Sequence, residues 1–224
     1  MKILEVKGLS KHFGGLKALS EVEFVVEQGE IFGIIGPNGS GKTTLFNVIT
    51  GIYPVTAGIV IYQEKLIDGL APYEVTRKGI VRTFQNIRIF GNMSVMDNVL
   101  VGRHCKMRTS LTEALLKTKV KQKTEALARE KASYFLEYVG LSKKKNEIAT
   151  NLSYGEQRRL EIARALASEP SLLLLDEPAA GMNPYDAGQL MSIIKSIRDM
   201  GITILVIEHN MQVLMGISNR VMVL

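Results

Sequence analysis

The sequence has almost no cysteine and no hydrophobic stretch long enough to cross a membrane. Cys105 is the only cysteine in 224 residues, which excludes an internal disulfide framework and a metal site built from several cysteines. His104 precedes it, but no other His or Cys lies nearby in the sequence, so we interpret Cys105 as incidental. No apolar run approaches the roughly 20 residues of a membrane-spanning helix, and residues 1–5 do not resemble a signal peptide. We therefore expect a protein of the cytosol or of the cytosolic side of a membrane.

Aromatic residues are missing from the most basic stretch of the chain. The formal charge is +6, which permits contact with nucleic acid or an anionic membrane surface. Many Lys and Arg residues fall between Arg103 and Lys131, namely Lys106, Arg108, Lys117, Lys119, Lys121, Lys123 and Arg129. No aromatic residue occurs among them before Tyr134, whereas proteins that bind single strands stack bases on aromatic rings. We interpret the stretch as a solvated helical face and expect no nucleic-acid partner.

The hydrophobic residues are sufficient for a substantial core. They make up 46% of the chain, whose length suits one α/β domain or a core with a small subdomain. Alternating apolar residues up to about residue 30, with turn signals at Gly14-Gly15 and Gln28-Gly29, predict short strands of an antiparallel layer. We expect residues 59–62 to join this layer. Between about 85 and 150, two or three helices ending at Gly140 are predicted from apolar positions such as Leu127, Phe135, Leu136 and Val139.

One turn carries a clear chemical signal. An apolar run, residues 31–35, leads into Gly36-Pro37-Asn38-Gly39-Ser40-Gly41-Lys42-Thr43, which Thr44 and a predicted helix over 45–50 follow. This order of strand, glycine-rich turn, Lys-Thr and helix is typical of a phosphate-binding loop. Backbone N–H groups of such a loop face phosphate oxygens, and its glycines leave room for them. Lys42 adds a charge toward the β- and γ-phosphates, and the Thr43 hydroxyl can bind Mg²⁺. A turn that only connects a strand to a helix is the alternative.

Two further apolar runs end in polar residues. Leu172–Leu175 precedes Asp176-Glu177, and residues 202–207 precede Glu208-His209, with a helix predicted over 186–200 between them. Such continuous runs are typical of strands buried on both faces of a parallel sheet. Ligands of open α/β sheets bind at the carboxyl ends of the strands. The sequence therefore predicts that these residues and the phosphate-binding loop meet at one edge.

The polar residues at these strand ends suit hydrolysis of a nucleoside triphosphate. Asp176 has the position of a carboxylate that holds Mg²⁺ through water, and Glu177 can act as general base toward water at the γ-phosphate. Carboxylates that only cap a helix are the alternative. Gln85 offers an amide that could reach the metal and the water. His209 taken alone could be an ordinary buried histidine.

A second phosphate-binding element is predicted further along the chain. Ser153 and Gly155, in the stretch 152–156, lie at the start of a predicted helix, whose N-terminus can bind an anion. Phe13, in an exposed-looking turn, either stacks on a purine or packs within the protein. A chain with two phosphate-binding elements either closes on itself or shares each nucleotide between two copies.

In this order the motifs resemble the nucleotide-binding cassette of ABC transporters over essentially the whole chain. The resemblance implies Phe13 as the adenine-stacking residue, Gly36–Thr43 as Walker A and Gln85 as the Q-loop. It implies Leu152–Glu156 as the signature, with Ser153, Gly155 and Glu156 at the nucleotide. It further implies Leu172–Asp176 as Walker B, Glu177 as catalytic base and His209 as the switch histidine. It also implies an α/β fold, a P-loop NTPase (RecA-like) core with a parallel sheet, an N-terminal antiparallel β layer and an inserted helical subdomain. We expect residues 1–84 and 165–224 in the core and about 85–164 in the helical subdomain of a single domain, with ATP and Mg²⁺ as cofactors.

The resemblance also implies partners. The family implies a head-to-tail dimer with a second ATPase subunit, identical or different, in which Ser153 and Gly155 of one copy contact the γ-phosphate on the other. Residues 82–90, 98–104, 177–184 and 207–211 resemble the cassettes of high-affinity branched-chain amino acid importers. This implies ATP-driven uptake with membrane permease subunits on the cytosolic face of the cell membrane, and indirectly a solute-binding protein. There are three alternatives. The chain could be a soluble ABC ATPase of translation or DNA repair, the cassette of another transporter such as a lipid exporter, or a non-enzymatic nucleotide switch.

Three positions depart from the family pattern. Tyr154 stands where Gly is usual, Glu156 where Gln is usual, and Asn183 where Asp is usual. Because Ser153 and Gly155 are kept, we expect the fine geometry to differ and the activity to remain. The chain ends at Leu224 within a predicted strand, so a truncated chain without an edge strand and C-terminal helices is one interpretation.

Overall fold

The computed structural model describes residues 1–104 and 119–224, and of the second stretch the side chains from 123 onward. The chain forms two compact units. One comprises Met1–Gln85, Pro170–Gly181 and Ala187–Leu224, and the other comprises Asn86–Glu169 and Met182–Asp186. The interpretations of Cys105 and of the basic residues at 106, 108 and 117 lie outside the described residues.

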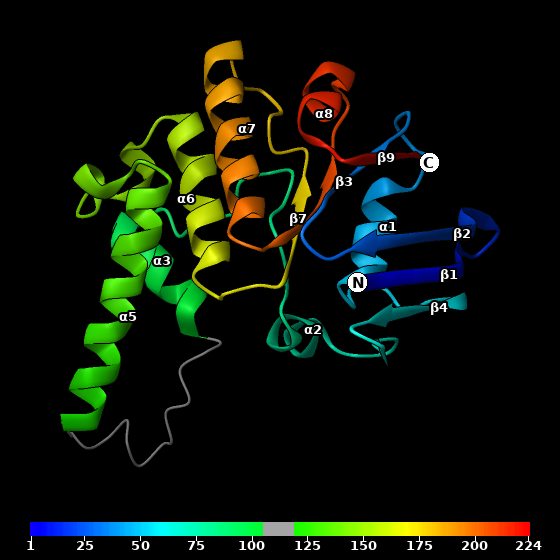
Figure 1. The fold of residues 1–224 in the computed structure, drawn as a ribbon, viewed down its shortest axis with the longest axis horizontal. Helices are drawn as coiled ribbons and strands as arrows, with labels where there is room; N and C mark the ends of the chain where they lie inside the picture. Colours follow the sequence, from blue (N-terminus) through cyan, green and yellow to red (C-terminus); the bar gives the residue numbers. More distant parts are fainter. Residues whose placement is uncertain (105–118) are drawn as a thin grey trace. The chain divides into compact units, whose positions relative to one another are not determined.

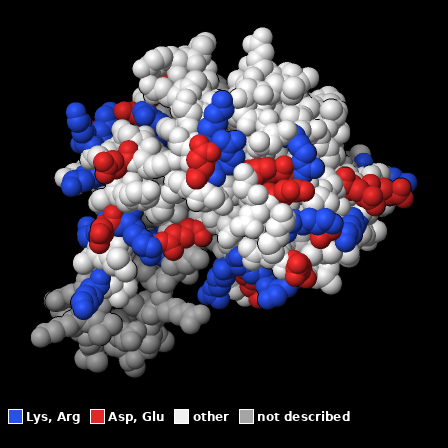
Figure 2. Space-filling view, viewed as in Figure 1, with Lys and Arg blue, Asp and Glu red and all other residues white. Residues whose placement is uncertain are grey.

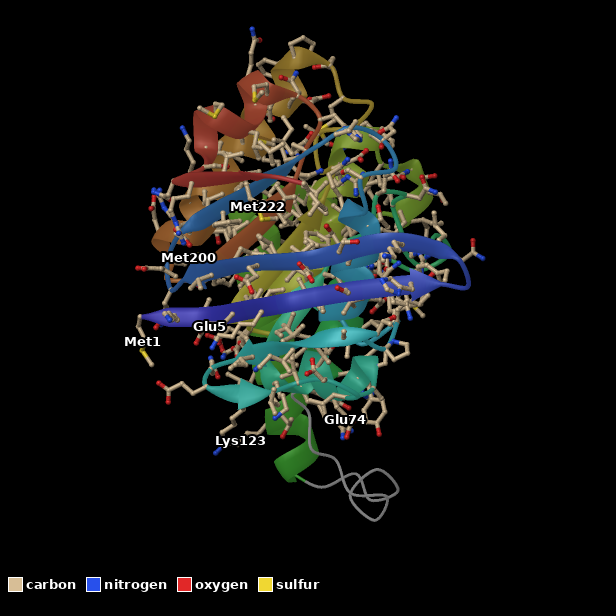
Figure 3. The ribbon with its side chains drawn as sticks, turned by 90° about the vertical axis from the view of Figure 1, so that its right-hand side faces the viewer. Met1, Glu5, Glu74, Lys123, Met200 and Met222 are labelled. Atoms are coloured by element: carbon tan, nitrogen blue, oxygen red, sulfur yellow. The ribbon has the colours of Figure 1, made fainter. Side chains whose placement is uncertain are left out.

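The first unit contains two β-sheets. Its strands are β1 (Lys2–Phe13), β2 (Leu16–Glu27), β3 (Ile31–Ile35), β4 (Ala57–Tyr62), β5 (Lys65–Leu66), β6 (Ile80–Arg82), β7 (Leu172–Asp176), β8 (Thr203–Ile207) and β9 (Arg220–Val223). One sheet has the order β2-β1-β4-β5 with antiparallel pairs, and Figures 1 and 3 show β1, β2 and β4 side by side. The other has the order β6-β7-β8-β3-β9 with parallel pairs. The predicted parallel sheet and antiparallel layer are both confirmed, and residues 59–62 join the layer.

The strands β1 and β2 are longer than predicted. Each has 12 residues, and they are joined at the predicted Gly14-Gly15 turn. Shifts of register along their pairing, for example between Val6 and Leu9, interrupt the strict alternation without ending either strand. The prediction of short strands was wrong because such irregularities read as strand ends in the sequence.

The parallel sheet is buried because its strands are almost entirely apolar. Every residue of β7 and β8 is buried, as the runs at 172–175 and 202–207 predicted. Helix α1 (Lys42–Ile49) buries Leu45, Phe46 and Ile49 in the same core as residues of β1 and β3. The helix begins three residues before the predicted start at 45, since the phosphate-binding loop passes directly into its first turn. The sheet thereby carries the loop at the end of β3.

Within its described residues the first unit has three further helices, of which only the one predicted over 186–200 was expected from the sequence. They are α2 (Pro72–Lys78), α8 (Met211–Ile217) and most of α7 (Pro184–Asp199). In α7, Leu190, Ile194 and Ile197 are buried on one face, as their spacing predicts.

The second unit is helical in its described part. It contains α3 (Val95–Arg103), α5 (Lys119–Tyr138), α6 (Tyr154–Leu166) and two short 3₁₀ helices, Ser142–Lys144 and Ala149–Asn151. Helix α3 contacts both α5 and α6, and the three lie together in Figure 1. Helix α5 ends shortly before Gly140, as predicted, and Gly140 has a φ of 73°. Of the apolar positions that predicted these helices, Phe135, Leu136 and Val139 are buried. Leu127 is 50% exposed, because the buried face of α5 runs through Ala128 and Ala132.

The charged side chains on the face drawn in Figure 2 do not form a large patch of a single sign. Basic and acidic side chains are interspersed across that face. Of the helices within residues 1–104 and 119–224, none combines the length and the apolar character needed to cross a membrane.

Candidate nucleotide and metal site

A cleft in the first unit brings together most of the residues predicted to bind a nucleotide. Its volume is about 720 Å³. It is lined by Phe13, Leu16, Lys17, Ala18, Asn38, Gly39, Gly41, Lys42, Thr43, Thr44, Gln85, Glu177 and His209. The cleft thus joins the β1–β2 turn, the phosphate-binding loop and two strand ends of the parallel sheet. Ser153, Gly155 and Glu156 belong to the second unit and are described separately.

The phosphate-binding loop is closed on its inner side and open on its outer side. A Cβ on Gly36 would lie 2.5 Å from the Leu224 carbonyl oxygen, and one on Gly41 would lie 2.5 Å from that of Ala18. Gly41 has a φ of 98°, and Gly39 a φ of 85° with no atom within 4 Å of its ideal Cβ. Glycine is required here because other residues rarely adopt these angles and because the backbone approaches neighbours closely. The open side at Gly39 leaves room for phosphate oxygens beside the backbone.

Lys42 lies against the loop that it follows. Its Nζ donates hydrogen bonds to the carbonyl oxygens of Gly36 and Pro37, both at 2.8 Å. The hydroxyl of Ser40 in the same loop is buried and has no hydrogen-bond partner within the described residues. An ammonium group and an unsatisfied buried hydroxyl at one concave loop both suit a phosphate ligand, which would accept hydrogen bonds from them.

Phe13, which lines the cleft, lies beside a second aromatic ring. The Phe13 side chain is 41% exposed, and the Tyr53 ring meets it edge-on with centroids 5.2 Å apart. Lys11 Nζ lies 4.9 Å from the centroid of the Phe13 ring. Phe13 was predicted as the purine-stacking residue, whereas Tyr53 and Lys11 were missed, since they follow no recognisable motif. Together they hold the Phe13 ring while part of it remains exposed in the cleft.

Glu177 is held between two other predicted site residues. Its Oε2 accepts a hydrogen bond from Gln85 Nε2 at 2.7 Å, and His209 Nε2 contacts its Oε1. The backbone of Glu177 has a φ of 47°, which is uncommon for a residue other than glycine, and its N–H donates to the Ile207 carbonyl at 2.9 Å. Because the residue after β7 turns in this way, Glu177 faces the cleft while Asp176 stays within the sheet.

Asp176 is buried, and its two carboxylate oxygens have different surroundings. Its side chain is 2% exposed, and Oδ2 accepts a hydrogen bond from Arg82 Nη2 at 2.7 Å. Oδ1 has no hydrogen-bond partner in the part of the chain that the structure describes. Mg²⁺ prefers oxygen ligands and keeps several waters, so this free oxygen, the Thr43 hydroxyl and the Gln85 amide oxygen fit such an ion. Arg82, which binds Oδ2, was not among the site residues predicted from the sequence.

The predicted second anion site is formed by the start of α6. The Ser153 hydroxyl accepts a hydrogen bond from the Glu156 N–H, and Glu156 Oε2 accepts one from the Ser153 N–H at 3.0 Å. This reciprocal arrangement is a capping box. Lys144 also donates to the Glu156 carboxylate. Burial raises the pKa of Glu156, but the hydrogen bonds from Lys144 and Ser153 outweigh burial and keep the pKa below its usual range. Glu156, which was predicted to contact the nucleotide, is thus charged and engaged in shaping the helix start.

Asn183, where the resemblance predicts Asp, has a local role. Its Oδ1 accepts a hydrogen bond from the Asp186 N–H at 2.8 Å, and its Nδ2 donates to Asp186 Oδ2 at 2.8 Å. A Cβ on Gly155 would lie 3.2 Å from the same Asp186 oxygen. An amide can donate and accept in this arrangement, whereas a charged Asp would place two carboxylates against each other. The departure at Asn183 is therefore matched to Asp186 and to Gly155.

The family follows from comparison with known proteins. A model of the family described as ABC transporter matches residues 19–180. The chain belongs to the ABC transporter family. It is 45% identical to the high-affinity branched-chain amino acid transport ATP-binding protein LivG of Salmonella typhimurium, over 99% of this chain and 87% of that protein.

Solved structures support the same assignment. A crystal structure of the ADP conformation of an ATP-binding cassette of an ABC transporter has a TM-score of 0.87 and 35% identity, covering 100% of this chain and 87% of that one. A dimeric ATP-binding cassette in a post-hydrolysis state, bound to ADP and Pi, has a TM-score of 0.81 and 26% identity over 99% and 94% of the two chains. The predicted fold class, with its P-loop NTPase core, and the resemblance to ABC ATPases are confirmed.

Glu208 is a buried carboxyl group of the cassette to which the sequence assigned no role. Its side chain is 3% exposed, and Oε1 accepts a hydrogen bond from the Ala179 N–H at 2.8 Å. It thereby connects the end of β8 to the segment that follows Glu177. Burial raises the pKa of Glu208, and the nearby negative charge of Glu177 adds to this, while its hydrogen bonds and His209 partly offset both.

The raised pKa of Glu208 predicts a pH-dependent effect of Glu208→Gln. A carboxyl whose pKa is raised on folding stabilises the fold below its unfolded pKa, and this contribution is lost as the pH rises through the folded pKa. Glutamine cannot ionise and still accepts from the Ala179 N–H, so the variant should be more stable than the wild type at pH 8, with the difference disappearing toward pH 4. Thermal unfolding at both pH values measures this. The exposed Glu64→Gln serves as control, and a Glu208→Gln variant that is less stable at pH 8 would contradict the prediction.

Proposed function

We propose that this cassette is the ATP-hydrolysing subunit of an importer of branched-chain amino acids. The observation that carries the catalytic part is the Glu177 carboxylate, held by Gln85 and His209 in the cleft that also contains the phosphate-binding loop. The substrate class is taken from LivG, which is named for branched-chain amino acid transport.

The cleft residues and Asp176 suggest a division of tasks in hydrolysis. Phe13 stacks on the adenine, while the loop N–H groups and Lys42 bind the phosphates. Thr43, Asp176 and Gln85 would hold Mg²⁺, which supplies positive charge to the β- and γ-phosphates when bound.

Glu177 takes the proton of the attacking water, and His209 keeps the carboxylate oriented toward it. A general base contributes when it lies within hydrogen-bond reach of the water that it activates. The position of Glu177 between Gln85 and His209 supports this role, because both of its oxygens have neighbours that restrict the carboxylate.

The site is completed by a second cassette in this proposal. Ser153 and the start of α6 on one subunit bind the γ-phosphate held by the other, in a head-to-tail arrangement. The α6 N-terminus supports this, since its N–H groups and dipole favour an anion. Dimeric cassettes exist among the solved relatives. ATP closes the dimer and hydrolysis reopens it.

The partners in the membrane would be permease subunits, with a solute-binding protein acting on the other side. The cassette would then lie on the cytosolic face of the cell membrane without entering the bilayer. The segment from Gln85 to Leu100 would transmit dimer closure to the permease. The competing function is a soluble ABC ATPase of translation or DNA repair, which would not associate with membranes.

Uptake by cells tests this proposal. Deletion of the gene should abolish high-affinity uptake of labelled leucine, isoleucine and valine and leave lysine uptake unchanged. The wild-type cassette should restore uptake and sediment with the membrane fraction, whereas the Glu177→Gln variant should sediment with membranes without restoring uptake. Unchanged leucine uptake would contradict the substrate class. A wild-type cassette absent from the membrane fraction would contradict the transporter role.

A further inference from the structure

Arg82 connects three parts of the nucleotide site. It lies at the end of β6, and its side chain is 5% exposed. Nη2 donates to Asp176 Oδ2 at 2.7 Å, and Nη1 donates to Asn47 Oδ1 at 2.6 Å. Its Cζ lies 5.3 Å from the ring centroid of Phe46 and 5.1 Å from that of Phe84. One side chain thus contacts α1, the end of β7 and the residue before Gln85.

These contacts restrain the Asp176 carboxylate. Oδ2 is bound to Arg82, while Oδ1 is buried and lacks a hydrogen-bond partner within the described residues. A buried oxygen without a partner costs free energy, so it needs a donor that the described chain does not supply. A metal-bound water is such a donor. Because the bond to Arg82 limits rotation of the carboxylate, Oδ1 keeps one direction.

We propose that Arg82 is a positioning residue for Mg²⁺, an inference that rests on the proposed function. It orients Asp176 so that Oδ1 accepts from the ion's water, and through Asn47 it keeps the end of β7 in place beside α1, which carries Thr43. Arginine suits this task because its planar guanidinium donates in fixed directions to two acceptors at once. A lysine would present one charged nitrogen in place of the two nitrogens that bond Asn47 and Asp176. Outer partners of metal ligands typically contribute about 10- to 100-fold in metal affinity.

The chain offers a matched arginine outside the cleft. Arg220 pairs with Glu30 at 2.6 Å and lies over the ring of Phe32, with 5.1 Å from Cζ to the centroid. Arg220 itself pairs with Phe32 near the start of β3, whereas the phosphate-binding loop follows the end of β3. Arg220 therefore combines the same kinds of contact, an ion pair and an aromatic ring, without contact to the site.

The test measures binding of a non-hydrolysable ATP analogue to the whole cassette by calorimetry, with EDTA and across a Mg²⁺ series. For Arg82→Met we expect the Mg²⁺ concentration at half-maximal effect to rise by about 10- to 100-fold. Affinity in EDTA should stay within about twofold of wild type, since Arg82 does not touch the phosphate-binding loop. Arg82→Lys and Asn47→Leu should shift the Mg²⁺ requirement in the same direction by less. Arg220→Met should leave both quantities unchanged.

Each outcome decides between positioning and a purely structural role. An unchanged or lowered Mg²⁺ requirement in Arg82→Met, or an equal loss of affinity with EDTA and with Mg²⁺, would overturn the inference. If Arg82→Met does not fold, Arg82→Lys and Asn47→Leu carry the same comparison, with folding checked by thermal unfolding. Failure of the wild-type cassette to bind the analogue would instead contradict the proposed function. If the wild type and the variants bind the analogue with the same Mg²⁺ requirement, only the role of Arg82 is overturned and the proposed function stands.

Discussion

Replacement of Lys42 by Ala is expected to weaken ATP binding by the cassette strongly. Lys42 Nζ donates to the Gly36 and Pro37 carbonyls and lies at the concave loop, so the change removes both an internal support and the charge that meets the phosphates. Hydrogen bonds to charged groups contribute about 1.5–3 kcal/mol each. The loss of one such bond raises the dissociation constant of ATP by roughly 10- to 150-fold.

A fluorescent ATP analogue measures this change, and Lys17→Ala is the matched control. Lys17 is exposed and also lines the cleft, so it tests whether any nearby positive charge would suffice. We expect its affinity to change by less than about threefold, because an exposed charge is screened. Thermal unfolding without nucleotide separates a folding defect from lost binding. Lys42→Ala that folds and binds ATP as tightly as the wild type would show that the loop lysine has no part in binding.

The phosphate-binding loop could be predicted because its geometry depends on neighbouring residues in the sequence. Gly39 and Gly41 are required by positive φ angles, and Lys42 reaches back only to Gly36 and Pro37. The strands β7 and β8 could be predicted equally well, since burial on both faces demands continuous apolar runs. Polar residues directly after such runs then meet at one edge, as Glu177 and His209 do.

The contacts around Asp176 could not be predicted, because they join residues far apart in the sequence. Arg82 and Asp176 are 94 positions apart, and Asn47 comes from a third segment. No local pattern indicates that pairing, and it depends on β6 lying beside β7 in the sheet. Tyr53 beside Phe13 is a similar case. The exposure of Leu127 was not predicted either, since small alanines occupy the buried face of α5.

Replacement of Glu177 by Gln is expected to slow ATP hydrolysis by about 10²- to 10⁴-fold, the usual contribution of a general base. Glutamine has nearly the same shape and can still interact with Gln85 and His209, but it cannot take a proton from water. ATP binding should therefore remain within about threefold of wild type, because the loop and Lys42 are unchanged. The ATP-bound variant should accumulate as a dimer, since the step that reopens the dimer is blocked.

The exposed Glu64→Gln is the control for loss of a carboxylate in general, and it should hydrolyse ATP at the wild-type rate. A low rate in Glu177→Gln together with equally weak ATP binding would indicate a damaged cleft and not a missing base. Both quantities are therefore needed from the same preparation.

Formation of phosphate in a single turnover tests the central claim most directly. Wild-type cassette and Glu177→Gln are each loaded with ATP, Mg²⁺ is added, and samples are quenched in acid over time. Acid frees all phosphate formed by hydrolysis, so that neither ATP binding nor departure of the product from the site limits the measured rate. The account predicts full ATP occupancy in both proteins and phosphate formation at least about 100-fold slower in Glu177→Gln. Phosphate formation at a near wild-type rate in Glu177→Gln would contradict the assignment of Glu177 as the group that activates water.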